Sequence, residues 1–334
     1  MNVTVLGSGS WGTTLAIVLH ENKHSVCCWA YEKEVVDDIV TNRENTRFLP
    51  GIKIPMDIKY TNDINDSIKQ AEVIIIAIPT QLIRSVLATL PGKLPEKCIW
   101  VSVSKGIENK SLLRISQILH QHFTIDHRSI AVLSGPSHAE EVSHKIPTAL
   151  VAASNTMETA HTVQKLFMNP YFRVYSNTDI IGVELGGSLK NIIAIATGIC
   201  TGAGFGDNTI AALMTRGLTE ISRLGLKLGA QPDTFAGLSG MGDLIVTCMS
   251  KHSRNRFVGE QIGKGRTLNS IMKDMIMVAE GVTTTDSVNQ LAQQENVDMP
   301  ITREVYNVLF KGKKPVIAVK DLMTRASKTE DWGE

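Results

Sequence analysis

The chain lacks the features that mark secreted, membrane-spanning and nucleic-acid-binding proteins. Its 34 Lys and Arg almost balance its 33 Asp and Glu, so the formal net charge of +1 predicts no bulk attraction to nucleic acid or to an anionic membrane. A strand pattern begins at residue 3, which leaves no room for a cleavable signal or transit segment. Neither an internal repeat of solenoid length nor a low-complexity segment is visible.

Long uninterrupted hydrophobic runs are also missing. The run Val73–Ile78 is too short to cross a bilayer. The longer apolar region around Ile180–Gly204 contains Glu184, Lys190 and repeated glycines, which is typical of a buried helix in a soluble protein. We therefore expect no integral membrane segment.

The cysteines form no pattern that predicts a disulfide framework or a zinc site. Their number is odd, and no CxxC pair occurs. Most lie in apolar surroundings, which predicts buried, reduced thiols in a cytoplasmic protein. The five are Cys27, Cys28, Cys98, Cys200 and Cys248.

No nucleophile triad or metal-ligand cluster stands out either. His120, His122 and His127 share one polar segment without a neighbouring acid or cysteine pattern, so we interpret them as surface residues and expect no metal.

A glycine-rich turn near the N-terminus is the most informative motif present. The β-rich run Val3–Leu6 leads into Gly7-x-Gly9-x-x-Gly12, and apolar residues then recur at helical spacing. In a strand–turn–helix of this kind, the first glycine permits a tight turn, the second lets the backbone approach phosphates, and the third lets the helix pack on the strand. Free amides at the helix N-terminus attract an anion. The pattern predicts a dinucleotide site, although a βα turn that binds nothing has the same sequence form.

The first half of the chain alternates strand and helix signals. This alternation predicts a Rossmann-type, doubly wound α/β domain with a parallel sheet over residues 1–178. The expected strands are Asn2–Leu6, Ser25–Trp29, Val73–Ile78, Ile99–Val103, Ile130–Leu133 and Thr148–Ala152. The expected helices are Trp11–His20, Glu32–Asn42, Gln81–Leu90 and Ser111–Gln121.

From Asp179 onward, strand-like runs nearly vanish and helical periods take over. We predict an all-α C-terminal domain over residues 179–334, with a charged and partly mobile final stretch from Lys311. The expected helices are 180–203, 208–228, 256–263, 268–273, 284–295 and 301–310.

Distinctive residues follow three of the predicted strands. Ligands of open α/β sheets bind outside the carboxyl ends of the strands. Pro79-Thr80-Gln81, Ser104-Lys105-Gly106 and Ser134-Gly135-Pro136-Ser137 stand at such ends. Lys105 can reach the crevice from there, or it is an ordinary surface lysine at the start of a loop.

Lys190 is the sharpest chemical signal in the second half. It precedes a stretch from Ile192 to Gly206 without any charged residue. Burial of a lysine lowers its pKa toward a range that is useful for proton transfer, so Lys190 is a candidate proton donor and acceptor for a carbonyl. The alternative is a lysine that snorkels from an apolar helix. Gly186 and Gly187 would let a ligand or the other domain approach the backbone.

Two further segments of the second half carry candidate functional residues. The glycine-dense turn Leu238–Gly242 ends in Asp243, which could orient Lys190 or a substrate hydroxyl, or cap a helix that begins at Leu244. Ser253 as an N-cap, with Arg254 beside it, forms a plausible phosphate cradle; a solvated basic loop is the alternative.

Taken together, these motifs resemble those of bacterial NAD(P)-dependent sn-glycerol-3-phosphate dehydrogenases. The resemblance runs from residue 3 to about residue 325. It rests on the glycine turn with Trp11, Ser104-Lys105-Gly106, Ser134-Gly135-Pro136-Ser137, Glu184-Leu-Gly-Gly-Ser-Leu-Lys190-Asn191, Thr215-Arg-Gly-Leu-Thr-Glu220, Gly237-Leu-Ser-Gly-Met-Gly-Asp243 and Ser253-Arg-Asn255.

The resemblance implies hydride transfer between NAD(P)H and a small phosphorylated three-carbon substrate, with a role in phospholipid synthesis. It implies Lys190 as proton donor and acceptor, with Lys105 and Asp243 also catalytic. The substrate contacts it implies are Lys105, Gly135, Ser137, Lys190, Asp243, Ser253, Arg254 and Asn255. The cofactor contacts that it implies are Ser10, Trp11, Lys105, Ala139, Arg254, Val278 and Glu280. To these the glycine turn adds Gly7, Gly9 and Gly12, and Tyr31, which departs from the family pattern, could stack on the adenine.

Two other functions remain open from the residues. A related dehydrogenase for a β-hydroxy acid or ketopantoate would bind a carboxylate in place of the phosphate. A non-catalytic nicotinamide-binding sensor would keep the glycine turn but would not need Lys190, Asp243 and Arg254 together.

The sequence leaves cofactor preference and association open. The second strand ends Cys27-Cys28-Trp29-Ala30-Tyr31, without the acid that selects NAD or an arginine for a 2′-phosphate, so we expect use of both cofactors. Ser137 also stands where the family often has threonine. The resemblance favours a homodimer, and the apolar residues Ile271, Met272, Met275, Ile276 and Met277 could pack internally or against a second subunit.

Overall fold

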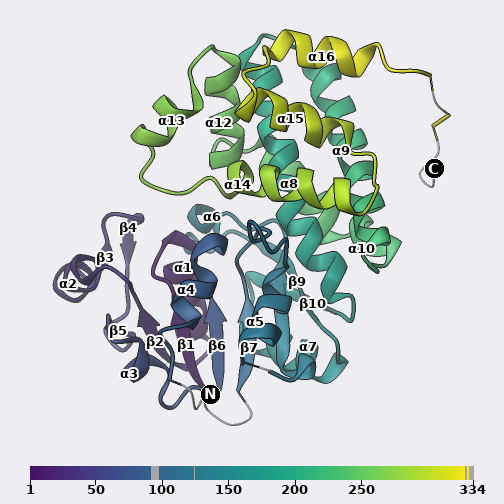
Figure 1. Ribbon diagram of the computed structural model, residues 1–334. Coiled ribbons are helices and arrows are strands. Elements are labelled where there is room, and N and C mark those ends of the chain that lie inside the picture. The colour runs from purple at the N-terminus through teal and green to yellow at the C-terminus, as the bar shows by residue number, and fades with distance from the viewer. Residues whose placement is uncertain (92–97, 124, 328, 331–334) are drawn as a thin grey trace. The chain divides into compact units, whose positions relative to one another are not determined.

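The computed structural model describes the chain apart from residues 92–97, 124, 328 and 331–334. It divides into two compact units (Figure 1). The sheet unit comprises Met1–Ser104 and Ile115–Ile180, and the helical unit comprises Lys105–Arg114 together with the chain from Ile181 onward. The sequence places residues 105–114 in the first domain, whereas they pack with the second unit. Residues Lys105–Arg114 are called the strap below.

The sheet unit contains one eight-stranded sheet in the order β10-β9-β8-β7-β6-β1-β2-β5. Its strands are β1 (Asn2–Leu6), β2 (Ser25–Trp29), β5 (Lys59–Thr61), β6 (Val73–Ile76), β7 (Ile99–Ser102), β8 (Ile130–Ser134), β9 (Thr148–Ser154) and β10 (Phe172–Asn177). A separate antiparallel hairpin consists of β3 (Glu44–Asn45) and β4 (Leu49–Lys53).

The strand order confirms the predicted doubly wound architecture. Six strands, in the order β5-β2-β1-β6-β7-β8, run parallel. Successive strands are added on one side from β1 to β2 and β5, and on the other side from β6 to β7 and β8, so the direction of strand addition switches between β1 and β6. Strand β9, predicted as a further strand of a parallel sheet, instead pairs antiparallel with β8. The connection from β8 to β9, residues 135–147, contains only the five-residue helix α6 (Ala139–Ser143), and an antiparallel pair needs no crossover helix that returns the chain to the start of β8.

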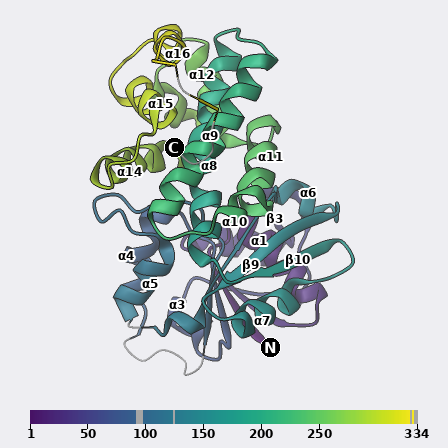
Figure 2. The same ribbon diagram turned by 90° about the vertical axis from the view of Figure 1, so that its right-hand side faces the viewer.

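Helices cover both faces of this sheet (Figure 2). On one face α1 contacts α6 and α7, and on the other α4 contacts α5. Strand β6 lies in the middle, and its residues Val73, Ile74, Ile75 and Ile76 are fully buried, as a continuous apolar run predicts. The helices of this unit are α1 (Ser10–Glu21), α2 (Lys33–Asn42), α3 (Ile64–Ile68), α4 (Ile83–Leu87), α5 (Ile115–Phe123), α6 (Ala139–Ser143) and α7 (Met157–Phe167).

The helix expected at Ser111–Gln121 begins four residues later than predicted, at Ile115, and is α5. The residues before Ile115 belong to the strap, which contains no helix. Its Ile107 and Leu112 are buried in the hydrophobic cluster of the helical unit. Tertiary burial therefore determines the conformation of this segment, and local helical periodicity does not.

All regular elements described after Asn177 are helical, as expected. They are α8 (Ile180–Gly202), α9 (Asp207–Lys227), α10 (Pro232–Ala236), a π-helical turn (Leu238–Gly242), α11 (Asp243–Met249), α12 (Arg254–Gly263), α13 (Leu268–Asp274), α14 (Glu280–Gln294), α15 (Pro300–Phe310) and α16 (Pro315–Met323).

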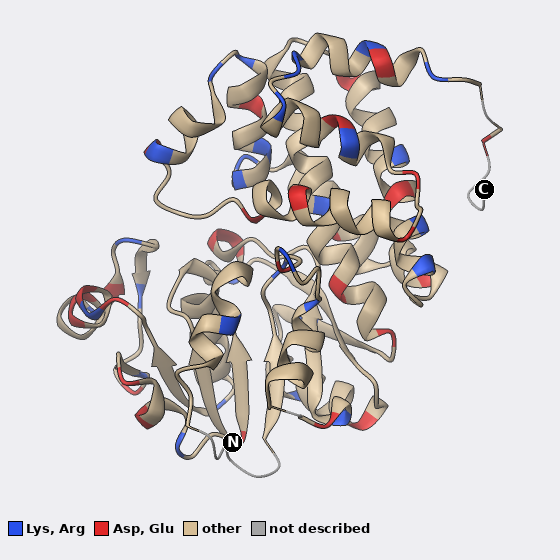
Figure 3. Cartoon of the chain, viewed as in Figure 1, with Lys and Arg blue, Asp and Glu red and all other residues tan. Residues whose placement is uncertain are grey.

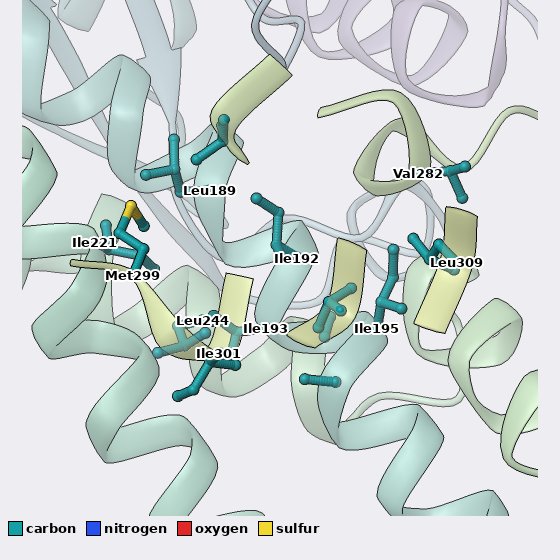
Figure 4. Packing of buried hydrophobic residues seen from close by; sticks show 14 of the residues in the cluster. Leu189, Ile192, Ile193, Ile195, Ile221, Leu244, Val282, Met299, Ile301 and Leu309 are labelled. Atoms are coloured by element: carbon teal, nitrogen blue, oxygen red, sulfur yellow. The ribbon is translucent and has the colours of Figure 1, made fainter. Parts of the chain in front are cut away.

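Helix α8 forms the centre of the helical unit. Its length and apolar composition would allow it to cross a membrane, but 94% of its most apolar window is buried within the structure. Leu189, Ile192, Ile193 and Ile195 of α8 pack among side chains of neighbouring helices (Figure 4). The prediction of a buried core helix is confirmed.

A buried carboxylate joins two further helices of this unit. Glu220 of α9 accepts hydrogen bonds from the backbone amides of Ile301 (2.5 Å) and Thr302 (3.1 Å) at the start of α15. Burial raises the pKa of Glu220 to about 7, against the lowering effect of these amides. Glu220 thus satisfies helix-terminal donors that would otherwise lack partners.

The end of the chain is more ordered than the sequence predicts. Within the stretch from Lys311, α16 spans Pro315–Met323, and Lys313 forms ion pairs with Glu304 and Asp321. Residues 328 and 331–334 of this stretch lie outside the described part. Elsewhere, charged residues of both signs are interspersed over each unit (Figure 3).

The β1–α1 turn requires glycine for steric reasons. Gly7 has φ +111°, and a Cβ on Gly12 would lie 1.9 Å from the Gly7 carbonyl oxygen, a backbone atom that cannot move aside freely. A Cβ on Gly9, in contrast, would meet no atom within 4 Å. Only the first and third glycines are therefore needed for packing.

We predict that Gly12→Ala lowers the free energy of unfolding by about 1–3 kcal/mol, because the added methyl group overpacks the turn. Gly9→Ala is the matched control and should cost clearly less. Thermal unfolding of both variants beside the parent chain measures the difference. Equal melting temperatures for the two variants would show that the close contact at Gly12 is not limiting.

Candidate functional site

The turn after β1 presents a helix N-terminus beside open space. Helix α1 begins at Ser10, and no side chain caps it, because its N-cap is Gly9. The space beside the Gly9 Cα is open, since a methyl group there would have no protein atom within 4 Å. A helix N-terminus with a glycine at its edge suits a phosphate group. Trp11 lies in the first turn and is half-buried, with its ring 6.5 Å from that of Phe172.

The end of β2 carries no acid. Tyr31 is 80% exposed, and its ring meets Trp29 edge-on at 6.3 Å. Glu32 follows as the N-cap of α2. An exposed aromatic ring at this sheet edge can stack on a base, while no carboxylate of Trp29–Tyr31 can repel a 2′-phosphate.

The segment after β8, which carries Gly135, Ser137 and Ala139, contacts the helix that follows the glycine turn. After β8, Gly135 adopts φ +144°, and Ser137 donates a hydrogen bond from Oγ to the Gly135 carbonyl at 2.9 Å. Ala139 then opens α6, and its carbonyl accepts a hydrogen bond from Thr14 Oγ1 of α1 at 3.5 Å. The structure thus brings Ala139 next to the helix that the glycine turn begins.

In the helical unit, one carboxylate binds two lysines. Asp243 Oδ1 lies 2.5 Å from Lys190 Nζ, and its Oδ2 lies 2.6 Å from Lys105 Nζ. The side chain of Asp243 is 1% exposed, that of Lys190 is 7% exposed, and that of Lys105 is 20% exposed. Three residues that are far apart in sequence therefore form one buried charge cluster, with Lys105 as its most accessible member.

Thr247 completes this cluster and was not predicted from the sequence. Its Oγ1 accepts a hydrogen bond from Lys190 Nζ at 2.5 Å and donates one to the Asp243 carbonyl at 2.6 Å. Asp243 opens α11, and Thr247 stands one turn later on the same face. That i, i+4 spacing was the available signal. The interpretation of Asp243 as a cap for a helix at Leu244 is wrong, since the N-cap is Gly242.

The cluster controls the protonation of Lys190. Burial lowers the pKa of Lys190 to about 8, Asp243 opposes this shift, and the charge of Lys105 adds to it. A lysine with a pKa near neutral pH can both donate and accept a proton at useful rates.

Close helix packing places Asp243 beside Lys190. A Cβ on Gly186 of α8 would lie 2.6 Å from the Ser239 carbonyl oxygen, so only glycine lets the turn Leu238–Gly242 approach α8. The expectation that a ligand or the other domain uses this approach is wrong for Gly186, because the turn of the same unit occupies it. The glycine therefore supports the charge cluster indirectly.

The start of α12 forms the predicted capped helix. Ser253 is the N-cap, and its Oγ accepts a hydrogen bond from the Arg256 amide at 3.2 Å. Arg254 is exposed and donates from Nη1 to the Val278 carbonyl at 3.0 Å. Asn255 is buried and accepts a hydrogen bond from the Gly281 amide at 2.9 Å.

These contacts connect three helices of the unit. The loop and first turn of α14, which carry Val278 and Glu280, lie against the start of α12 through the Arg254 and Asn255 bonds. A Cβ on Gly281 would lie 2.8 Å from the carbonyl oxygen of Asn191, the residue after Lys190. The exposed Arg254 guanidinium and the N-terminus of α12 thus lie beside Val278, in the loop that leads into α14.

A cavity in the helical unit is lined by none of the predicted site residues. Its volume is about 760 Å³, and Ile199, Leu213, Arg216, Val305 and Leu322 line it. In the described part of the chain, no group of three or more His, Cys, Asp or Glu could hold a metal ion. Of the three histidines in the segment after Ile115, His120 and His127 stack on each other, with ring centroids 3.7 Å apart.

Comparison with known proteins identifies the family. The family model for the N-terminus of NAD-dependent glycerol-3-phosphate dehydrogenase matches residues 2–160, and the model for its C-terminus matches residues 179–320. The glycerol-3-phosphate dehydrogenase [NAD(P)+] of Prosthecochloris aestuarii is 51% identical over 99% of this chain and 100% of its own length. The protein of that name from Bacillus subtilis is 51% identical over 98% of this chain and 95% of its own length.

A solved structure agrees with the sequence relatives. The crystal structure of glycerol-3-phosphate dehydrogenase from Coxiella burnetii superimposes with a TM-score of 0.93 at 37% identity, covering 97% of this chain and 99% of that one. The superposition and the matched lengths agree with the sequence relatives. The chain belongs to the NAD-dependent glycerol-3-phosphate dehydrogenase family.

Proposed function

We propose that the protein interconverts dihydroxyacetone phosphate and sn-glycerol 3-phosphate with NAD(P)H, mainly in the direction that supplies glycerol phosphate for phospholipid synthesis. The buried cluster of Lys190, Asp243 and Lys105 is the observation that carries this proposal, because it supplies a proton donor of suitable pKa. The identity to enzymes named for this reaction, over nearly the whole chain, supports the substrate.

The proton of the reaction comes from Lys190. In reduction, a hydride reaches the ketone carbon, the carbonyl π electrons move to oxygen, and the Lys190 ammonium gives that oxygen a proton. In oxidation, neutral Lys190 takes the hydroxyl proton while the hydride leaves the carbon. Asp243 and Thr247 hold the Lys190 ammonium in place, and Lys105 lowers its pKa and contributes a cation to the substrate.

The phosphate of the substrate is proposed to bind at the start of α12. Ser253, Arg254 and Asn255 supply a helix N-terminus and a guanidinium, which together suit a dianion. Gly135 and Ser137 of the sheet unit are proposed as further substrate contacts. The local geometry supports the first set more strongly than the second, because only α12 offers a cation.

The pyrophosphate of the dinucleotide is proposed to bind at the β1–α1 turn, and the nicotinamide of the bound dinucleotide would supply the hydride. The open space beside Gly9 and the uncapped start of α1 fit a pyrophosphate. Tyr31 is proposed to stack on the adenine, because its ring is exposed at the end of β2. The remaining residues are assigned by the family resemblance: Ser10, Trp11, Lys105, Ala139, Arg254, Val278 and Glu280.

A related dehydrogenase for a β-hydroxy acid or ketopantoate is not favoured, because the relatives that span this chain carry the glycerol-3-phosphate name. Such an enzyme would bind a carboxylate at α12, so inorganic phosphate should not compete with its substrate. A non-catalytic sensor would bind NADH without turnover. Consumption of NAD(P)H with dihydroxyacetone phosphate, inhibited by glycerol phosphate, separates the proposed function from both.

We predict that Lys190→Ala lowers kcat for dihydroxyacetone phosphate by about 10²–10⁴-fold, the usual effect of losing a positioned general acid. Binding of NADH alone, followed by fluorescence, should change little, because the proposed pyrophosphate site belongs to the other unit. Lys313→Ala, which removes a lysine from two ion pairs of the helical unit, is the control for stability. A kcat of Lys190→Ala within about tenfold of the parent would show that another group supplies the proton.

We predict that the enzyme uses NADH and NADPH with a preference of about tenfold or less, equivalent to about 1.4 kcal/mol. The end of β2 offers Tyr31 for stacking but neither an acid nor an arginine for the 2′ position. Comparison of kcat/KM for the two cofactors is the measurement. A preference beyond about a thousandfold would reveal a 2′ contact elsewhere in the chain.

We also propose a cytoplasmic homodimer. Of the apolar residues suggested for an interface, Ile271 is fully buried in the helical unit and Met272 and Met275 pack against its core, whereas Ile276 is 69% exposed. A second set of exposed apolar residues lies on α16, where Val316 is 61% and Met323 is 80% exposed. Light scattering at micromolar concentration should give twice the mass of the chain, and a monomer would contradict this proposal.

A further inference from the structure

The strap lies in sequence between two parts of the sheet unit but packs with the helical unit, where several contacts hold it. Ser188 of α8 donates a hydrogen bond to the Gly106 carbonyl at 3.4 Å, and Ser287 of α14 donates one to the Ile107 carbonyl at 3.1 Å. Ile107 itself is 0% exposed. Lys105 is therefore held at one end of a segment whose course is set by α8 and α14.

The other end of the strap is fixed by a buried ion pair. Arg114 Nη1 lies 2.5 Å from Glu184 Oε2, and the two side chains are 13% and 4% exposed. Glu184 precedes Lys190 on α8. Helix α8 thus carries both Glu184, which anchors the strap, and Lys190. Lys190 pairs with Asp243, and Lys105 of the strap pairs with the same carboxylate.

The backbone of the strap is tightly turned between these ends. Lys110 and Leu112 have φ values of +68° and +58°, which non-glycine residues seldom adopt. The Leu112 amide donates to the Glu108 carbonyl at 3.0 Å, and the Glu108 amide donates to the Leu113 carbonyl at 3.0 Å. A backbone in this region persists where surrounding contacts hold it, so loss of an anchor should let the turn relax.

We propose that Arg114 and Glu184 are positioning residues: their ion pair fixes the strap so that the Lys105 ammonium stays on Asp243. Neither side chain is proposed to touch the substrate. The inference rests on the proposed function, because it takes Lys105 to contribute to turnover of dihydroxyacetone phosphate. It adds to that function two residues that act through Lys105.

The test is a double-mutant cycle between Arg114→Gln and Lys105→Met, read out as kcat and KM for dihydroxyacetone phosphate. Arg114→Gln alone should lower kcat by about 10- to 100-fold, the range for a misplaced catalytic group. In the Lys105→Met background it should change kcat by less than about twofold, because the group that it positions is already gone. Arg114→Lys, which keeps a cation for Glu184, should recover most of the loss.

Glu304→Gln is the matched control, because it breaks another partly buried ion pair of the same unit, that between Glu304 and Lys313. Their side chains are 12% and 20% exposed. It should leave kcat unchanged in both backgrounds. If Arg114→Gln does not fold, Ser287→Ala provides the second route: it frees the Ile107 carbonyl and should lower kcat several-fold in the parent but not in Lys105→Met.

Equal losses from Arg114→Gln in both backgrounds, or a parent-like kcat for Arg114→Gln, would overturn the proposal. Failure of the proposed function is distinguishable, because the unmodified protein would then show no turnover of dihydroxyacetone phosphate.

Discussion

The proposed chemistry of this protein depends on one buried carboxylate that is shared by two lysines. Asp243 is almost inaccessible, yet it faces Lys190 and Lys105 at 2.5 and 2.6 Å. Two cations against one anion in a dry environment make the charged form of Lys190 less favourable than in water, and the pKa falls to about 8. Without Asp243, two lysines could not approach each other there, and Lys190 would lose its orientation.

Much of the helical unit serves to assemble this cluster. Gly186 admits the turn that precedes Asp243, Thr247 holds both Lys190 and the start of α11, and the strap brings Lys105. Helix α8 is the common support, and its apolar side chains are locked in the core of the unit (Figure 4). A rigid, well-packed helix keeps a proton donor within hydrogen-bond reach of its partner.

The sequence predicted elements whose signals are local. Strands β1 and β2 lie at the expected residues, the glycine turn joins β1 to α1, and Ser253 caps α12 as expected. Lys190 stood out because a lysine among apolar residues needs a partner, and Asp243 was named as a candidate for that role. Such features follow from periodicity, capping and charge within a few residues.

What the sequence did not predict depends on contacts between distant segments. The last part of the strap, from Ser111, looked like the start of a helix, because only burial of Ile107 and Leu112 in the helical unit shows the course of this segment. The antiparallel β9 and the role of Thr247 likewise depend on tertiary neighbours. The helix α16 packs on the helical unit through Ala318, which is buried in its hydrophobic cluster, and Leu322, a tertiary contact that no local pattern indicated.

The titration of the Lys190 amine tests this account most directly. Its rate of acylation by a small reagent can be followed against pH, with the modified peptide quantified by mass spectrometry. A pKa near 8 in the parent, with Lys105→Met raising it, is the result that the shared carboxylate and the neighbouring cation predict. Titration near 10.5, the ordinary value for lysine, would contradict the proposed electrostatics of the site.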